Sequence, residues 1–250
     1  MKVTAIKTPI VKKNDNLLDI IRDSIKTIPE NSVLVITSKI ISYCQGRIVK
    51  KALGGRNEKH SLVRQEADLY LEPSYSQYKM MLTIKNSTLA VNAGIDESNA
   101  DDGYVLWPNR IQKTTNKIWR FLKKNYHLKK VGVIITDSKT IPLRWGVIGT
   151  AISHCGFKAL YDYRGKEDLF GRKVKMSQAN VVEGIAVSAV LEMGEVAEKN
   201  PLCLVQNIKR IKFQNRPPTK KELEDLKVSP KDDVFGPLLT SVDWVKRKAC

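Results

Sequence analysis

Two aspartates stand where apolar runs of the sequence give way to polar residues. Asp96 follows the run in TLAVNAGI, and Asp137 follows VGVIIT, with Ser138 directly after it. A carboxylate at the end of a strand reaches the rim of a sheet with little freedom, which suits a hard divalent cation that prefers oxygen ligands. Aspartate and serine at such positions also commonly make turns. Each aspartate alone therefore fits an ordinary turn, and the similar layout of the two makes a metal site a candidate.

Basic residues near other predicted strands are candidates for binding anions. Ser38 and Lys39 follow the apolar run SVLVIT, and the lysine there could hold a phosphate as a point charge. Arg144 could clamp a carboxylate or a phosphate, or its stem could pack beneath Trp145, and the two interpretations are about equal. The patterns GxxxxGK[ST], GxGxxG and GxSxG are absent from the sequence. A nucleotide would therefore be bound in an uncommon way.

Gly194 and Glu195 follow a long apolar segment. Gly194 is an ordinary signal for the end of a helix, and Glu195 by itself fits a solvated charge, although it could be a third oxygen ligand. The cysteines are scattered and form no CxxC pair, so neither a zinc site nor a redox motif is predicted. They are Cys44, Cys155, Cys203 and Cys250.

The hydrophobic pattern predicts the elements that position these residues. Strands are expected over 1–10, 32–39, 40–50, 80–84, 88–95, 129–138, 146–160 and 203–213, with 80–84 and 88–95 forming a hairpin. Helices are expected over 17–28, 60–71, 108–126 and 177–194, and one or two short ones in the tail. Strands and helices are mixed without a regular βαβ alternation, which favours the α+β class.

Composition bounds the class of protein. The chain has 250 residues, 42% of them hydrophobic, which fits one large domain or two closely interwoven ones. Forty-three Lys and Arg against 26 Asp and Glu give a net charge of +17, which favours anionic partners. The excess is mostly lysine spread along the chain, and nucleic acid is not the expected partner. No apolar run approaches the ~20 residues that span a bilayer, and the N-terminus has no signal-peptide core. We expect a cytoplasmic protein with no membrane partner.

Several segments, in this order, resemble the coenzyme F-420-0:γ-glutamyl ligase family. They are TPIVKKND, SKIISYCQGR, NAGIDESN, GVIITDS, RWGVIGTAISHCGFKAL, DLFGRKV and a helix that ends in MGE. The similarity is weak over 51–78 and in the tail. It implies a ligase-like domain over 1–213, with 51–78 as an insert, and a basic C-terminal extension over 214–250 packed on it. It also implies an α+β fold of mixed sheets with packed helices, in two interwoven subdomains, and a homodimer.

The resemblance implies a reaction and its cofactors. The amine of L-glutamate would be joined to a carboxylate of the deazaflavin precursor, a coenzyme F-420-0-like acceptor, with GTP cleaved to GDP and phosphate. Mg²⁺ or Mn²⁺ would be required, and a monovalent cation such as K⁺ would assist. Since a carboxylate is a poor electrophile, it would first become an acyl phosphate that the amine then attacks. Such chemistry depends on positioning and on neutralising phosphate charge, so no catalytic Cys–His pair is needed.

The resemblance also transfers site residues to this chain. The metal ligands would be Asp96, Asp137, Ser138 (threonine is usual there) and Glu195. The nucleotide contacts would be Pro9, Ile10, Val11, Lys12, Ser38, Lys39, Asn99, Met193 and Gly194. We predict catalytic roles for Arg144 and Asp137.

Some residues depart from the family pattern. Tyr43 stands where lysine is usual, Gln45 stands where glutamate is common, and 196–200 replaces a glycine-rich stretch, while 51–78 is shorter than usual. These changes leave the implied metal ligands in place and alter the residues around them. A folate-like acceptor is therefore an alternative, as is a non-catalytic basic nucleic-acid-binding descendant. The second is less favoured, because such a scaffold has little physical need to keep both aspartates.

Overall fold

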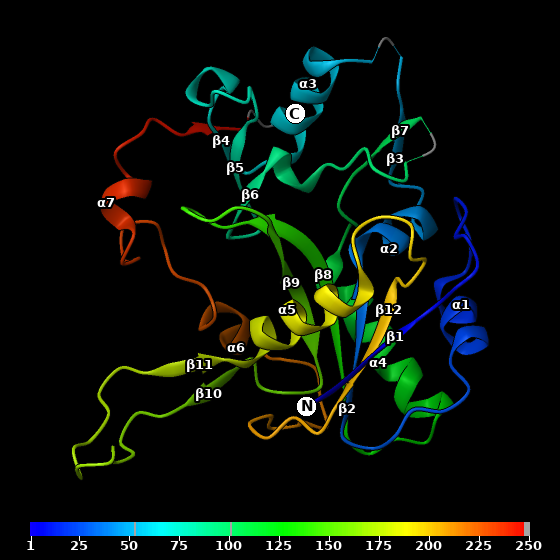
Figure 1. The fold of residues 1–250 in the computed structure, drawn as a ribbon, viewed down its shortest axis with the longest axis vertical. Coiled ribbons are helices and arrows are strands. Elements are labelled where there is room, and N and C mark those ends of the chain that lie inside the picture. Colours follow the sequence, from blue (N-terminus) through cyan, green and yellow to red (C-terminus); the bar gives the residue numbers. More distant parts are fainter. Residues whose placement is uncertain (53, 101, 248–250) are drawn as a thin grey trace.

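A computed structural model gives the fold of the chain and describes residues 1–52, 54–100 and 102–247 (Figure 1). Its centre is a five-stranded sheet in the order β1–β12–β2–β8–β9, in which β2 and β8 are parallel and the other neighbours are antiparallel. These strands are β1 (Lys2–Ile6), β12 (Leu202–Gln206), β2 (Ser32–Thr37), β8 (Val131–Thr140) and β9 (Val147–Cys155). The apolar runs of β2 and β8 are typical of strands that are covered on both faces.

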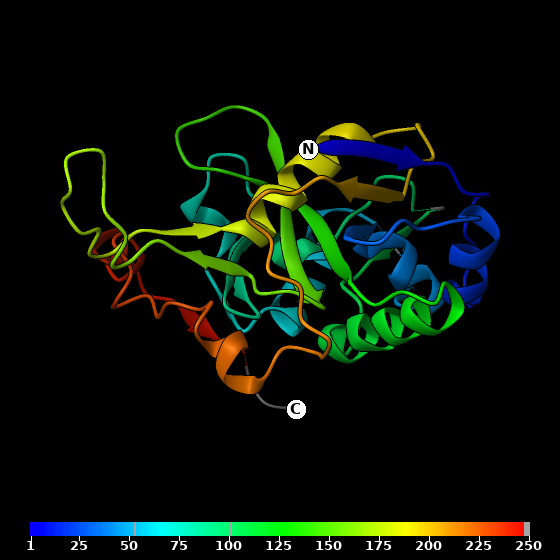
Figure 2. The same cartoon turned by 90° about the horizontal axis from the view of Figure 1, so that it is seen from below.

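Helices cover both faces of this sheet. They are α1 (Leu17–Ser24), α2 (Ser38–Cys44) and α4 (Ile111–Asn125) on one face and α5 (Val181–Met193) on the other. Figure 2 shows α4 and α5 on opposite sides of the central strands. Successive side chains of a strand point to opposite faces. In β2, Leu34 and Ile36 therefore join the core beneath α1, α2 and α4, whereas Val33 and Val35 pack with α5.

Local signals set the ends of α5. The side chain of Asn180 accepts a hydrogen bond from the backbone N–H of Glu183 at 3.2 Å and caps the first turn. The helix ends at Gly194, whose φ of +79° is a conformation that glycine adopts without strain. The chain turns there into a loop over 194–201 that leads to β12.

A second, smaller core lies beside the main sheet. Its sheets pair β3 (Ile48–Lys50) with β7 (Gly103–Val105), and β13 (Val245–Lys246) with β4 (Leu69–Tyr70), β5 (Leu82–Lys85) and β6 (Thr88–Val91) in that order. Its helical elements are α3 (Arg56–Glu66) and the 3-10 turns η1 (Pro73–Tyr75) and η2 (Asn92–Gly94). Val63, Met81 and Tyr104 are fully buried between them.

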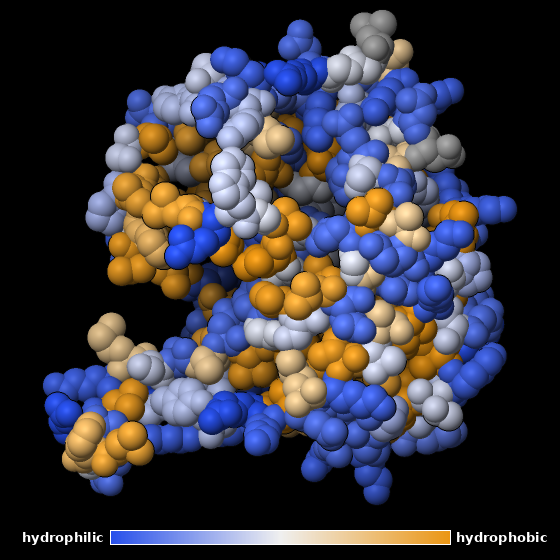
Figure 3. All heavy atoms as spheres, in the orientation of Figure 1, coloured by the Kyte–Doolittle hydropathy of each residue, from blue (hydrophilic) through white to orange (hydrophobic). Residues whose placement is uncertain are grey.

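Two further features extend from these cores. An arm made of β10 (Leu160–Asp162) and β11 (Gln178–Asn180) projects from the body, and apolar surface is visible at its end (Figures 1 and 3). The C-terminal segment contains α6 (Lys220–Glu224) and α7 (Gly236–Leu239), and its strand β13 pairs with β4. This segment therefore runs from the main body back to the smaller core.

The mixture of sheets and helices confirms the expected α+β class. The predicted hairpin is present as β5 and β6, and its turn residues Asn86 and Ser87 have φ values of +50° and +60°. Positive φ at both central residues is what a type I′ turn of a two-residue hairpin requires. Within the described residues, none of the helices is both long and apolar enough to cross a membrane.

The strand predicted over 40–50 is wrong in its first half, where the chain forms α2. Ile40 and Ile41 are buried in the main core, and the Ser42 hydroxyl donates to the backbone O of Leu106 at 2.6 Å. These long-range contacts favour a helix in a segment whose local pattern is ambiguous. The helix predicted over 60–71 also differs, because α3 begins at Arg56 and β4 follows it.

Burial of His154 on β9 predicts a stability that depends on pH. Its side chain is 3% exposed, and loss of hydration lowers the pKa of the imidazole to about 4 from 6.5. Above pH 6.5 both folded and unfolded chains hold it neutral. As the pH falls from 6.5 towards 4, the unfolded state takes up a proton that the folded state rejects. Between pH 7 and pH 5 we expect the free energy of unfolding to fall by about 2 kcal/mol from this group.

Urea unfolding at pH 7 and pH 5 measures this effect. His154→Gln should remove most of the pH-dependent loss, whereas His127→Gln, a matched change of an exposed histidine, should leave it in place. An equal loss in wild type and His154→Gln would contradict the prediction.

Candidate functional site

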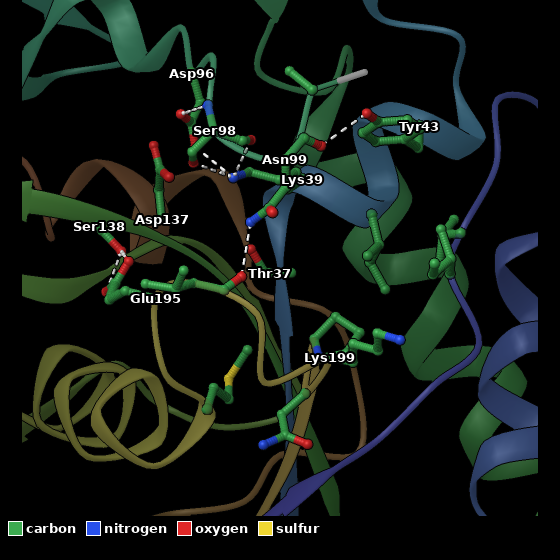
Figure 4. Close-up of a pocket in the computed structure, with 18 of the residues that line it drawn as sticks. Thr37, Lys39, Tyr43, Asp96, Ser98, Asn99, Asp137, Ser138, Glu195 and Lys199 are labelled. Atoms are coloured by element: carbon green, nitrogen blue, oxygen red, sulfur yellow. Dashed lines mark hydrogen bonds and ion pairs between the residues drawn. The ribbon is translucent and has the colours of Figure 1, made fainter. Parts of the chain in front are cut away.

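A cavity of about 1210 Å³ lies where the two cores meet. Its walls are the segment after β1, the ends of β2 and β8, the turn that follows η2, and the loop over 194–201. Figure 4 shows that Lys39 at the start of α2 points toward the Asp96 turn, and that Ser138 of β8 meets Glu195 at the start of the loop. A cavity of this size can hold a nucleotide together with a second small molecule.

Asp96 is placed by a tight turn of the smaller core. It follows η2 and forms a β-bridge with Val105. Its carboxylate accepts hydrogen bonds from the backbone N–H of Ser98 at 2.7 Å and from the Ser98 hydroxyl at 2.9 Å, and it forms an ion pair with Lys39 at 2.5 Å. Desolvation opposes its ionisation, but the Lys39 ammonium and these hydrogen bonds outweigh it and lower its pKa. Asp96 is therefore ionised at neutral pH and faces a lysine.

Asp137 is placed by β8 of the main core. The pairing of β8 with β9 shifts register between Ile135 and Thr136, just before Asp137, and such bulges commonly redirect a side chain beside an active site. The indole N–H of Trp107 donates to the Asp137 carboxylate at 2.5 Å. Desolvation dominates this group and raises its pKa to about 6, against the hydrogen bond from Trp107. An ionised Asp137 is thus held in surroundings that a cation would stabilise.

Glu195 closes the same side of the cavity from the end of α5. The hydroxyl of Ser138 donates to its two carboxylate oxygens at 2.8 and 3.0 Å (Figure 4). The loop that begins there is tied across the cavity, because the side-chain amide of Asn99 donates to the backbone O of Val196 at 2.8 Å. The four predicted metal residues therefore lie in one cavity, although they come from three distant segments.

Lysines line the cavity around these acids. They are Lys12, Lys13, Lys39, Lys50 and Lys199. Lys39 also donates to the hydroxyl and backbone O of Ser98, at 2.9 and 3.0 Å. Acidic groups beside a rim of lysines suit an anionic ligand whose phosphates are shared between a metal and ammonium groups.

The acidic residues fit a divalent cation in part. Hard oxygen donors from Asp96, Asp137, Ser138 and Glu195 suit Mg²⁺ or Mn²⁺. In the part of the chain that the structure describes, no three or more His, Cys, Asp or Glu side chains are grouped closely enough to hold a metal ion alone. Mg²⁺ is commonly bound by one or two carboxylates, with water and substrate phosphates completing its coordination. The donor set fits that mode and does not fit a closed protein cage.

Most of the predicted nucleotide residues line the cavity and two predicted residues do not. The lining includes Pro9, Ile10, Val11, Lys12, Lys39, Asn99, Met193 and Gly194. Ser38 is buried at the start of α2 and is not part of the lining. Arg144 lies in the exposed loop between β8 and β9, where its guanidinium donates to the backbone O of Leu143 at 2.9 Å. The fold thus does not bring Arg144 to the other site residues.

Sequence patterns alone missed three residues of the site. Ser98 carried a usable signal, because a serine two residues after an aspartate commonly hydrogen-bonds to it in a turn. Lys199 carried no signal beyond its charge. Trp107 follows β7 in an apolar stretch that predicts only burial, and its contact with Asp137 joins residues 30 positions apart.

Comparisons with known proteins identify the family of the chain. The family model F420-0:Gamma-glutamyl ligase matches residues 5–207. The chain is 30% identical over 220 residues to the coenzyme F420:L-glutamate ligase of Archaeoglobus fulgidus, covering 80% of this chain and 84% of that relative. It is 28% identical over 225 residues to the enzyme of that name from Methanococcus maripaludis, covering 83% and 88%. The enzyme of that name from Methanopyrus kandleri is 30% identical over 216 residues, covering 80% and 83%. The chain therefore belongs to the F420-0:gamma-glutamyl ligase family.

Proposed function

We propose that this protein is a GTP-dependent ligase that joins the amine of L-glutamate to a carboxylate of a coenzyme F420-0-like acceptor. Family membership supports the reaction class. The observation that carries the proposal is the meeting of Asp96, Asp137, Ser138 and Glu195 in one lysine-rimmed cavity. A basic protein that only bound nucleic acid would not need a desolvated carboxylate such as Asp137 in this cavity.

The acidic residues would hold Mg²⁺ or Mn²⁺, and K⁺ would assist as a monovalent cation. When bound, the divalent ion supplies charge neutralisation for the phosphate oxygens of GTP. Asp96 and Asp137 are the first candidates for ligands, because each presents carboxylate oxygen to the cavity from a different core. Lys39 would turn from Asp96 to a phosphate oxygen, which leaves Asp96 free for the ion. Ser138 and Glu195 complete the acidic side of the cavity from β8 and α5.

The reaction would proceed in two steps on the substrates. A carboxylate oxygen of the acceptor attacks the γ-phosphorus of GTP, so a P–O bond forms to the acceptor and the bond to GDP breaks. The amine of glutamate then attacks the acyl carbon, phosphate leaves with the bonding electron pair, and the nitrogen loses a proton. Residues of the chain bind and orient the reactants, and lysines such as Lys12 and Lys39 stabilise the anionic phosphates.

Product mass tests this function. The purified protein is incubated with Mn²⁺, L-glutamate and either GTP or ATP, with a coenzyme F420-0-like or a folate-like acceptor. We expect a mass increase of one or more glutamate residues on the deazaflavin acceptor with GTP. Glutamylation of the folate-like compound instead would correct the acceptor and keep the chemistry. The absence of product with every combination would contradict a ligase function.

Arg144 remains a prediction as a catalytic residue. Since its loop lies outside the cavity lining, it can contribute only by closing onto the acceptor. We expect Arg144→Ala to raise the KM for the acceptor about 10-fold, the effect of losing one charge-assisted hydrogen bond, and to leave GTP affinity unchanged. Arg144→Lys should restore little, because a bidentate clamp needs a guanidinium. Wild-type kinetics for Arg144→Ala would exclude the role.

We also propose a homodimer in which the arm of each protomer packs on the other. Leu169, Phe170 and Met176 on the arm are 99%, 80% and 87% exposed, and Leu143 and Trp145 on the loop between β8 and β9 are 95% and 93% exposed. Several large apolar side chains that are this exposed commonly mark a protein interface. Sedimentation should give a dimer for wild type and a monomer for Leu169→Asp combined with Phe170→Asp. A wild-type monomer at micromolar concentration would contradict this part.

A further inference from the structure

We propose that Trp107 is a positioning residue for Asp137, and that a partly buried charged cluster of Arg47, Glu66 and Lys85 holds Trp107 in place. This inference rests on the metal-binding role proposed above for Asp137. It concerns a residue that does not itself line the cavity but contacts residues that do. Its contribution would be to fix the direction in which the carboxylate of Asp137 points.

The contact between Trp107 and Asp137 is directional. The indole has a single N–H that can only donate, and it lies 2.5 Å from Oδ2 of Asp137. The tryptophan is 3% exposed, so water does not compete for this hydrogen bond. The indole thereby fixes Oδ2 of Asp137, and the remaining lone pairs of the carboxylate stay available to a cation. Groups that hold a metal ligand from behind typically set its affinity for the ion.

Trp107 also touches the segment that carries Asp96. A Cβ built on Gly94 would lie only 2.0 Å from the indole nitrogen of Trp107, and Gly94 has a φ of +69°. Only glycine therefore lets the turn pass over the indole, two residues before Asp96. The same ring hydrogen-bonds to Asp137 and packs beneath the Asp96 turn. Trp107 is thus a spacer between the two carboxylates that we expect to share a cation.

The partly buried charged cluster contacts Trp107 through both its side chain and its main chain. The Lys85 ammonium lies 5.4 Å from the centre of a ring of Trp107, within the range of a cation–π contact. Lys85 is 7% exposed and donates to Glu66 at 2.8 Å. Arg47 donates to both oxygens of Glu66 at 2.8 Å and to the backbone O of Trp107 at 3.2 Å. Side chain and main chain of Trp107 are therefore both held by this cluster.

The cluster links the weakly matched segment to the site. Glu66 is the last residue of α3, which lies in segment 51–78, and Lys85 ends β5. A purely structural role would be to satisfy buried charges of the smaller core. A positioning role predicts more than that. Loss of the indole N–H of Trp107 should weaken metal binding more than loss of the indole N–H of another buried tryptophan.

Trp119 provides a closely matched control. It is 5% exposed, its indole N–H donates to the backbone O of Val131 at 2.9 Å, and a Cβ on Gly156 would lie 2.3 Å from its nitrogen. Both tryptophans are thus buried, hydrogen-bonded and packed under a glycine. They differ in that Trp119 has no contact with an acidic residue of the site among its described hydrogen bonds.

The experiment measures Mn²⁺ binding to the full chain without nucleotide, by calorimetry and by the electron paramagnetic resonance signal of unbound Mn²⁺. Trp107→Phe keeps an aromatic ring and removes the donor, and we expect the dissociation constant to rise about 10- to 100-fold. Trp119→Phe should bind Mn²⁺ like wild type, although both variants lose thermal stability. Lys85→Met keeps the indole N–H and loosens the ring, and it should weaken binding in the same direction but less. It also serves if Trp107→Phe does not fold.

The outcomes separate this inference from the proposed function. Wild-type affinity in Trp107→Phe, or equal weakening in Trp107→Phe and Trp119→Phe, would overturn the positioning role and leave the metal site standing. Wild-type affinity in Lys85→Met would overturn the role of the cluster. A wild-type chain that binds no Mn²⁺ would overturn the metal site and the positioning role together.

Discussion

Asp137→Asn is expected to lower kcat/KM for glutamate ligation by about 10²- to 10³-fold, in the range seen when one electrostatic contact to a transition state is lost. The amide has the shape of the carboxylate and can still accept from Trp107, so the change removes charge and little else. Without metal, the variant should also unfold at a higher temperature than wild type. The reason is that desolvation raises the pKa of Asp137 to about 6, so its ionised form destabilises the fold at pH 7.

Two measurements check this pair of effects. Initial rates with GTP and Mn²⁺ give kcat/KM, and thermal scans with and without Mn²⁺ give the stabilisation that the ion confers. Mn²⁺ should raise the unfolding temperature of wild type and have little effect on Asp137→Asn. Asp68→Asn is the control, because Asp68 accepts a backbone hydrogen bond from Asn86 at 2.7 Å in the smaller core, outside the cavity. Activity within a few-fold of wild type in Asp137→Asn would remove the basis of the metal site.

Lys39→Met is expected to change the affinities for nucleotide and metal in opposite directions. Loss of a charged hydrogen-bond donor to phosphate should weaken GTP binding about 10- to 100-fold. The ammonium of Lys39 lies 2.5 Å from Asp96, where it competes with any cation for that carboxylate. Its removal should therefore tighten the binding of Mn²⁺ in the absence of nucleotide. General damage to the fold would instead weaken the binding of both GTP and Mn²⁺.

Titration of each ligand by calorimetry separates these cases. Lys51→Met is the control, because Lys51 pairs with Glu97 at 3.1 Å nearby but does not line the cavity. It should leave both affinities unchanged. GTP affinity that stays at the wild-type value in Lys39→Met would show that Lys39 only neutralises Asp96.

The sequence allows the prediction that the acidic residues converge, but not which local structures bring them together. The apolar run before Asp137 predicts β8, and the helix before Gly194 predicts where Glu195 begins a loop. The run before Asp96 predicts a strand over 88–95, whereas the chain forms η2 in its last part and a β-bridge carries Asp96. That turn depends on Trp107 fitting beneath Gly94, a contact between distant segments that no local pattern encodes.

The segment of α2 shows the same limit. SKIISYC has two adjacent isoleucines and no clear period, and its helix depends on burial of both against α1 and α4. The family resemblance implies a nucleotide contact for Ser38, yet Ser38 is buried at the start of the helix, while Lys39 lines the cavity. Helix and strand direct neighbouring side chains differently, so the secondary structure of this segment decides whether Ser38 or Lys39 can contact a ligand.

The division of the acidic site between two hydrophobic cores limits the conditions under which the protein can work. Asp96 belongs to the smaller core and Asp137 to the larger one, so the site exists only while both are folded. Parts of a protein can open at a lower free energy than the whole. The smaller core has fewer buried residues than either face of the main sheet, so we expect it to open first on heating and to end catalysis while the central sheet is still native. Reinforcing the smaller core would therefore extend the working temperature more than added stability in the central sheet.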